Sequence, residues 1–280
     1  MDKTKMTNQI KKFEEFLIVD RGLGKTTVGG YCRAMSIALR RMRKFCPQYT
    51  DVKKYMLWMH EKNYSYSHII NTSIAIEHYA KFKGVEIKLG RPRKPEQVVQ
   101  DTLSESEVSR LIQATKGARE KAIICLLAYS GIRNIELCAL RLKDLNLGDN
   151  HITIIGGKNR KDRRVNISAE CTKALIDYLA VYKREPDNFL FTTVVNKNQL
   201  ATCDVRKLIR TVAKRAKIGR RVFPHLFRHS LATNLLNRGA SLIMIKNQLG
   251  HAFIESTMIY ATSMPFRTRS EYDYFKPAYM

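Results

Sequence analysis

The spacing of apolar residues in the first 90 positions is typical of four amphipathic helices. One apolar stripe runs from Ile10 to Leu17, and a second, longer one runs from Tyr31 to Phe45. The signals that start and stop the helices are the turn at residues 21–24, Thr26 or Thr27, Pro47, Asp51, Ser65 or Ser67, and Gly84. This segment therefore predicts an all-helical domain.

From residue 101 onward, the pattern predicts helices around one short hairpin. Ser104 and Glu107 have the spacing of a capping box, and an apolar helix follows over residues 118–130. Residues 151–155 and 164–167 alternate as two strands on either side of a Gly-Gly turn. Further helices are expected over residues 169–182, 203–217, from Pro224 to Arg238, and 242–249. Ser241 is expected to cap the last of these helices, and Gly250 to end it. The fold class predicted for the chain is mainly α with a small antiparallel β-sheet.

A basic segment separates these two regions. Residues 88–98, KLGRPRKPEQV, contain two prolines, one glycine and four basic residues, a composition that favours an extended, exposed chain. We therefore expect a helical domain over residues 1–90, a linker over 91–100 and a second domain over 101–280.

The charge of the chain is extreme for a globular protein. Its 50 Lys and Arg residues exceed its 25 Asp and Glu residues, which leaves a net charge of +25. Both regions are basic, because residues 1–100 hold 20 basic against 9 acidic side chains and residues 101–280 hold 30 against 16. Such a balance indicates a polyanionic partner, and double-stranded DNA is the expected one. The expected DNA contacts are Arg40, Arg41, Arg43, Lys44, Arg91, Arg93, Arg160, Lys161, Arg206 and Arg210. The alternative is that these are solvated helix faces and turns.

The cysteines and the apolar runs of the sequence indicate in which compartment the protein is expected. The six cysteines have no CxxC spacing, so we expect small buried apolar side chains in a reducing compartment. No apolar run approaches the ~20 residues that a membrane span needs. These features favour a cytoplasmic protein with no membrane partner.

The richest candidate chemistry lies between Pro224 and Ala261. His225 and Arg228 share one face of the predicted helix, so both can reach one small anion. His251 follows a helix-ending glycine, and Tyr260 stands nine residues further on. Three alternatives remain open at this point: Tyr260 is a half-buried packing residue, His225 and His229 are a metal pair, or the basic groups are nucleic-acid contacts without chemistry.

Two further groups extend this candidate site. Arg133 begins a helix after Gly131, where free backbone amides favour an anion. Glu136 can pair with Arg133 and hold its guanidinium group still. A structural ion pair is the alternative. The hairpin turn holds Lys158, Arg160, Lys161 and Arg163, which could reach into a DNA groove or could be solvated.

Four segments of the sequence occur in this order: SGIRNIEL, GKNRKDRRV, HLFRH, and LGH followed by Tyr260. They carry a resemblance of residues 101–265 to the tyrosine recombinase (phage integrase) family. The basic helical region is similar to the SAM-like core-binding domain of that family, and the two-domain layout looks closest to Xer-type enzymes. The resemblance implies that Tyr260 is the nucleophile, Arg133 and Arg228 hold the phosphate, and Lys158 protonates the leaving oxygen. His225 and His251 would complete the site, with Glu136 supporting Arg133. Departures from the family pattern are Ser130, Ile132, Asn166 and Phe227, none of which carries the chemistry.

The expected reaction is site-specific recombination through a 3′-phosphotyrosyl intermediate. No cofactor is expected, because the sequence lacks both the carboxylate cluster of a metal site and a GxxxxGK[ST] phosphate loop. The alternatives are a type IB topoisomerase-like enzyme and a non-catalytic DNA-binding regulator. The resemblance also implies a homotetramer on two DNA sites, assembled through the C-terminal tail after Thr262, in a prokaryote, virus or mobile element.

Overall fold

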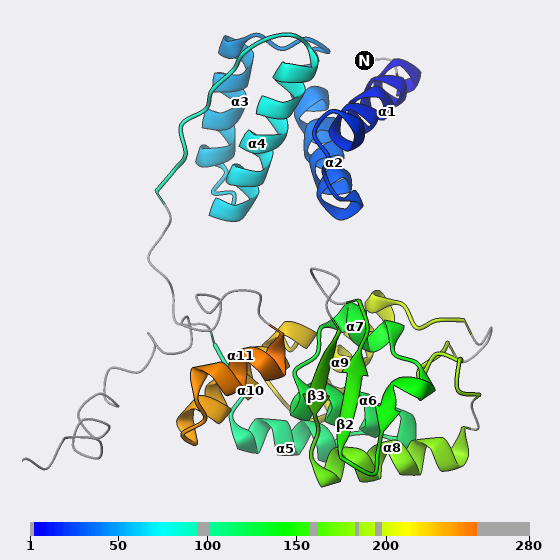
Figure 1. Ribbon diagram of the computed structural model, residues 1–280. Coiled ribbons are helices and arrows are strands. Elements are labelled where there is room, and N and C mark those ends of the chain that lie inside the picture. The colour runs from blue at the N-terminus through cyan, green and yellow to red at the C-terminus, as the bar shows by residue number, and fades with distance from the viewer. Residues whose placement is uncertain (1–2, 94–100, 157–161, 183–184, 194–197, 251–280) are drawn as a thin grey trace, which may run out of the picture. The chain divides into compact units, whose positions relative to one another are not determined.

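The computed structural model describes residues 3–93, 101–156, 162–182, 185–193 and 198–250 (Figure 1). The chain divides into two compact units, Met1–Val98 and Val99–Met280. Helices dominate both units, and the second unit also contains a small antiparallel sheet. The predicted fold class is confirmed.

The first unit is built from four helices. They are α1 (Lys3–Val19), α2 (Lys25–Met42), α3 (Tyr49–Glu61) and α4 (Tyr66–Phe82). Their apolar faces meet in one core, in which Phe13, Met35 and Tyr79 are almost fully buried. The rings of Phe13 and Tyr79 contact edge to face with centroids 5.1 Å apart.

Two of the predicted helix starts in this unit are wrong. Helix α2 begins after Gly24 without a side-chain cap, so neither Thr26 nor Thr27 is its capping residue. Helix α3 begins at Tyr49, because Gln48 and Asp51 form a reciprocal capping box that starts the helix two residues earlier than predicted. Ser65 caps α4 through a hydrogen bond from the His68 amide, as one of the two predicted alternatives.

The end of α2 also differs from the prediction. The helix stops at Met42, where Arg43 takes a left-handed conformation with φ 56°. Phe45 therefore lies beyond the helix, although its half-buried ring still packs against the core. The apolar spacing predicted that Phe45 belongs to the helix because its ring is directed to the core. The ring reaches that core from a non-helical backbone instead.

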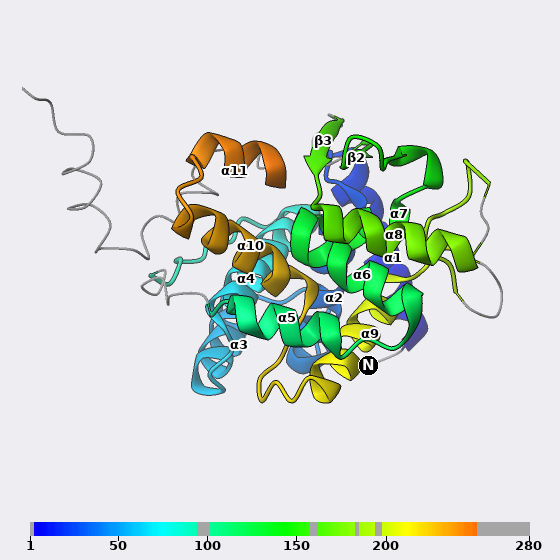
Figure 2. The same cartoon turned by 90° about the horizontal axis from the view of Figure 1, so that it is seen from below.

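The second unit contains seven further α-helices among its described residues, a 3₁₀ turn and three strands. They are α5 (Glu105–Gln113), α6 (Gly117–Ser130), α7 (Asn134–Ala139), η1 (Leu142–Asp144), β1 (Leu145–Asn146), β2 (His151–Ile154), β3 (Arg163–Asn166), α8 (Ala169–Val181), α9 (Thr202–Arg215), α10 (Pro224–Asn237) and α11 (Leu242–Leu249). The buried helix α6 packs against both α8 and α10, and Figure 2 shows it between them. The predicted caps Ser104, Gly131, Ser241 and Gly250 are all found at the ends of these helices.

The three strands form an antiparallel sheet in the order β1-β2-β3. In the register of the hairpin, Ile152 faces Val165 and Ile154 faces Arg163. This register corrects the prediction that placed Arg163 in the turn, because Arg163 is the first residue of β3. Its side chain shares the inward face of the strand with Val165, two residues on.

Four of the six cysteines are buried as predicted, but Cys46 and Cys203 are exposed. Within the described residues, no helix combines the length and the apolar character that crossing a bilayer requires. Over the same residues, no group of three or more His, Cys, Asp or Glu side chains is placed to hold a metal ion.

Candidate active site

Arg133 stands at the junction between α6 and α7. Helix α6 ends at Gly131, whose φ of +64° is a left-handed conformation that glycine adopts without strain. A Cβ at Gly131 would lie 2.7 Å from Leu249 and 2.9 Å from Leu231, so the close approach of α10 and α11 also requires glycine. Arg133 is then the capping residue of α7, and its side chain points into the site.

Glu136 fixes Arg133 through both its backbone and its side chain. The Arg133 amide donates to Glu136 Oε2 at 2.8 Å, and Arg133 Nη1 donates to Oε1 at 2.8 Å. The backbone amide that was expected to favour an external anion is thus bound by the carboxylate of the chain itself. The predicted contact between Arg133 and Glu136 is present.

Arg228 approaches the same place from α10. Only 3% of its surface is exposed, and its guanidinium group donates to the Gly131 carbonyl at 2.7 Å and to the Leu249 carbonyl at 2.6 Å. These carbonyls belong to the C-terminal ends of α6 and α11, where the partial negative charge of a helix terminus favours a cation. Burial of this charge is therefore offset by two helix ends.

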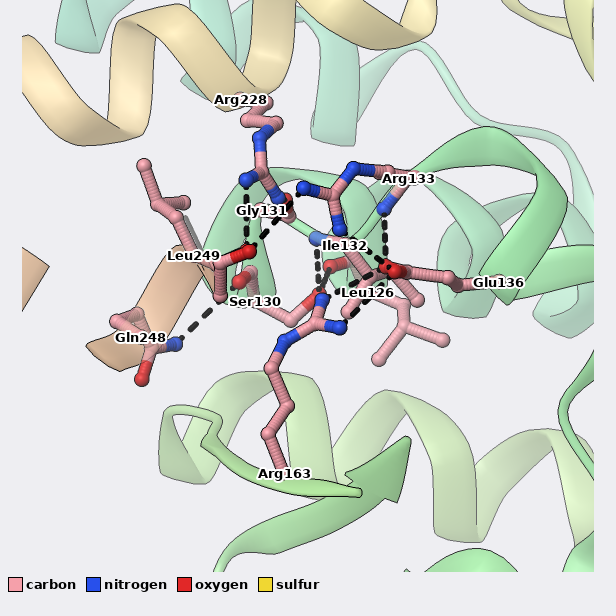
Figure 3. A network of polar contacts seen from close by, with 11 residues as sticks. Leu126, Ser130, Gly131, Ile132, Arg133, Glu136, Arg163, Arg228, Gln248 and Leu249 are labelled. Carbon is pink, nitrogen blue, oxygen red and sulfur yellow. Dashed lines mark hydrogen bonds and ion pairs between the residues drawn. The ribbon is translucent and has the colours of Figure 1, made fainter. Parts of the chain in front are cut away.

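Arg133 is also connected to the end of α11. Its Nη2 donates to the Gly250 carbonyl at 3.2 Å. Figure 3 shows the guanidinium groups of Arg133 and Arg228 side by side, with that of Arg163 approaching from β3. Segments around residues 133, 163, 228 and 250 thus meet at one site, although they are widely separated in the sequence.

His225 lies one turn before Arg228 at the start of α10. Burial of part of its ring lowers the pKa of His225, and the positive charges of Arg228, Arg133 and Arg206 lower it further. The ring is consequently neutral at pH 7 and able to accept a proton. Burial lowers the pKa of His229 more strongly, to about 4, so His229 is neutral as well.

A cleft of about 810 Å³ runs beside this group. Among its lining residues are Arg133, His225, Arg206 and Arg210, so the structure brings four of the predicted functional residues to one surface. Arg206 and Arg210 come from successive turns of the exposed face of α9.

The basic residues predicted in the first unit have mixed surroundings. Arg40, Arg41 and Arg43 are exposed, and the Arg41 guanidinium lies 4.4 Å from the centre of the Trp58 ring. Lys44 is paired with Asp51 at 2.8 Å. Arg91 donates to Glu77 at 2.5 Å and Arg93 is exposed.

Several predicted residues lie outside the described residues: Lys158, Arg160, Lys161, His251 and Tyr260. One functional candidate was missed by sequence reasoning. Arg163 was assigned to the turn, yet it is paired with Glu136 in the interior of the site. Its spacing of two from the apolar Val165 is the signal that could have placed it on the inward face of a strand.

The fold is of the integrase type, as comparisons with known proteins show. Residues 101–265 match the phage integrase family. Tyrosine recombinase XerA of Pyrococcus furiosus is 30% identical over 92% of this chain and 91% of its own length. A crystal structure of XerA recombinase is 30% identical with a TM-score of 0.57, covering 98% of this chain and 100% of that one.

A lower-identity structure shares the fold. The Tn1549 transposon integrase, solved in complex with transposon right end DNA, has a TM-score of 0.75 at 21% identity, covering 96% of this chain and 99% of that one. The chain belongs to the phage integrase family and is a tyrosine recombinase, similar to the Xer enzymes over nearly all of its length.

Proposed function

We propose that this recombinase cuts and rejoins double-stranded DNA at specific sites, with Tyr260 as the nucleophile. The observation that carries the proposal is the convergence of Arg133 and Arg228 beside Glu136, with Arg133 bonded to the residue directly before His251. Two guanidinium groups in one small site match the geometry and charge of a phosphodiester.

In the proposed reaction, the Tyr260 phenolic oxygen attacks the phosphorus and the bond to the 5′ oxygen breaks. A 3′-phosphotyrosine forms, and the leaving 5′ oxygen takes a proton from Lys158. A phenol has a pKa of ~10, so the attacking group needs a proton acceptor and nearby positive charge at neutral pH. The neutral His225 ring supplies the acceptor, and His251 completes the phosphate contacts.

In this scheme Arg133 and Arg228 stabilise the negative charge of the transition state, which a metal ion does in many other phosphoryl-transfer enzymes. The phosphotyrosyl bond keeps the energy of the original phosphodiester, so religation by the 5′ hydroxyl of the exchanged strand needs no ATP. Metal and nucleotide cofactors therefore have no role in the proposed cycle.

DNA binding is assigned to the basic surfaces of both units. In the second unit the cleft with Arg206 and Arg210 opens beside Arg133 and His225, which allows backbone contacts next to the scissile phosphate. Arg160 and Lys161 belong to the same assignment by their sequence position. In the first unit we assign Arg40, Arg41, Arg43 and Lys44, with Arg91 and Arg93 in the basic segment. The enzyme would act where its DNA lies, in the cytoplasm of a prokaryotic host.

The test of the proposed function is a nicked suicide substrate, which traps the covalent intermediate because the short strand beyond the cut diffuses away. Tyr260→Phe should bind the DNA as tightly as the wild type and form no adduct. An adduct formed by Tyr260→Phe would overturn the assignment of the nucleophile. Wild-type protein without any adduct would indicate a non-catalytic regulator, and relaxation of a single duplex without recombinant product would indicate a topoisomerase.

Recombination between two duplexes also requires assembly. We propose four copies on two DNA sites, joined through the tail that follows Thr262, whose aromatic residues Tyr272, Tyr274, Phe275 and Tyr279 supply apolar contact area. A chain ending at Thr262 should still form the adduct on one site and fail to assemble two sites. Assembly and strand exchange by the truncated chain would show that the tail packs on its own unit instead.

A further inference from the structure

Arg163 occupies an unexpected place at the start of β3. Its side chain is only 13% exposed, and its two terminal nitrogens donate to the two oxygens of Glu136 at 2.9 and 2.7 Å (Figure 3). This parallel pair of hydrogen bonds is the strongest arrangement between an arginine and a carboxylate. Glu136 is therefore held from the side opposite to Arg133.

The shared carboxylate sets the charge of the site. Arg133 and Glu136 alone would form a neutral pair, which attracts a phosphodiester weakly. With Arg163 as a second partner, the group of three carries a net charge of +1 in a low-dielectric surrounding. Arg163 thus allows Glu136 to orient Arg133 without cancelling its attraction for the phosphate.

Arg163 also contacts Gly250, the residue before His251. Gly250 has a φ of +66°, and a Cβ there would collide with the Arg163 side chain. Arg133 bonds to the carbonyl of this glycine, so both arginines fix one backbone position. The neighbouring Asp162 accepts a hydrogen bond from the Gly156 amide at 2.8 Å, across the base of the segment that contains Lys158.

We infer that Arg163 is a positioning residue for DNA cleavage. It offsets the charge of Glu136, so that Arg133 keeps a net attraction for the phosphate, and it packs the start of β3 against Gly250 at the end of α11. The inference rests on the proposed function, because it assigns Arg163 a role through Arg133. It differs from a purely structural role in one respect: the effect of Arg163 depends on the negative charge of the scissile phosphate.

The experiment measures the rate of adduct formation at saturating protein on two suicide substrates. One has an ordinary scissile phosphate, and the other has a methylphosphonate, in which a methyl group replaces one charged oxygen. The variants are Arg163→Met, Arg163→Lys and the control Arg164→Met, which removes the same charge from the exposed neighbour on the same strand. DNA affinity and thermal melting are recorded for each protein.

On the ordinary substrate, Arg163→Met should slow adduct formation by about 10- to 100-fold, as loss of an outer-shell partner does in other sites, while Arg164→Met stays within about twofold. Arg163→Lys keeps the charge but loses the paired hydrogen bonds, so it should slow adduct formation less than Arg163→Met does. On the methylphosphonate the defect of Arg163→Met relative to wild type should shrink to about threefold or less, because the neutral substrate needs less positive charge. Arg163→Lys, which keeps the charge, should show the same small defect on both substrates.

Equal defects of Arg163→Met on the two substrates, or a rate of Arg163→Met equal to that of Arg164→Met, would overturn the inference. If Arg163→Met melts below the assay temperature, Arg163→Gln, which also removes the charge, decides by the same comparison. A wild-type protein that forms no adduct on either substrate would instead contradict the proposed function.

Discussion

Arg133 and Gly250 are 117 residues apart in the chain, and a hydrogen bond of 3.2 Å joins the guanidinium Nη2 of one to the carbonyl of the other. This bond links the start of α7 to the end of α11. It places a cation of the site against the residue that precedes His251 in the sequence. The geometry of the site therefore depends on the packing of α11 as well as on the arginines themselves.

Replacing Arg228 with Lys should slow cleavage by about 10²- to 10³-fold, equivalent to about 3–4 kcal/mol of transition-state stabilisation. Lysine keeps the charge but cannot donate to the Gly131 and Leu249 carbonyls with the same planar group. Single-turnover rates at saturating protein would measure the effect. Arg238→Lys, at the exposed far end of α10, is the matched control and should retain the wild-type rate.

Gly131→Ala should destabilise the second unit more than Gly156→Ala does. Both glycines have positive φ, which costs about 1–2 kcal/mol for alanine. Only Gly131 would also press a Cβ against Leu249 and Leu231, which adds about 1–3 kcal/mol of overpacking. Urea unfolding of the two variants would measure the difference, and equal free energies of unfolding would contradict the close packing of α11.

Glu136 should make the protein sensitive to acid. Burial alone raises the pKa of this carboxyl. Hydrogen bonds from the Arg163 side chain and from the backbone and side chain of Arg133, together with the charge of Arg163, outweigh burial and lower this pKa to about 2. Because the folded pKa is below the unfolded one, the stabilisation is present above about pH 4.5 and is lost as pH falls toward 2. The loss amounts to at most about 3 kcal/mol.

The measurement for this carboxyl is the free energy of unfolding between pH 6 and pH 3, compared with Glu136→Gln. The glutamine variant should be less stable at pH 6 and should show a shallower decline. If the free energy of unfolding fell equally with pH in the two proteins, the pKa of Glu136 would not differ between the folded and the unfolded state.

Arg206→Ala and Arg210→Ala should each reduce the salt dependence of DNA binding. If each side chain neutralises one phosphate, the slope of log K against log salt concentration should fall by about 0.9 per substitution on B-DNA. Binding titrations at several salt concentrations would test this. Lys173→Ala, an exposed residue of α8 that does not line the cleft with Arg206, should leave the slope unchanged.

Much of the local structure follows from the sequence, because caps and turns depend on neighbouring residues. Ser104 and Glu107 close a capping box, Ser241 starts α11, and Gly131 and Gly250 end their helices as predicted. The failures are local as well. Asp51 is the third residue of α3 and not its capping residue, because Gln48 caps the helix and forms the capping box together with Asp51.

The sequence by itself determined the fold class, the basic character of both units and the family, because these depend on periodicity, charge and ordered motifs. It did not determine which cations meet. Arg228 reaches a carbonyl 97 positions away, and Arg163 was predicted in a turn although it pairs with Glu136, 27 positions away. Those contacts form only when α10, α11 and β3 pack around the end of α6. Burial then forces each charge to find a partner, and the tertiary structure alone decides which one it is.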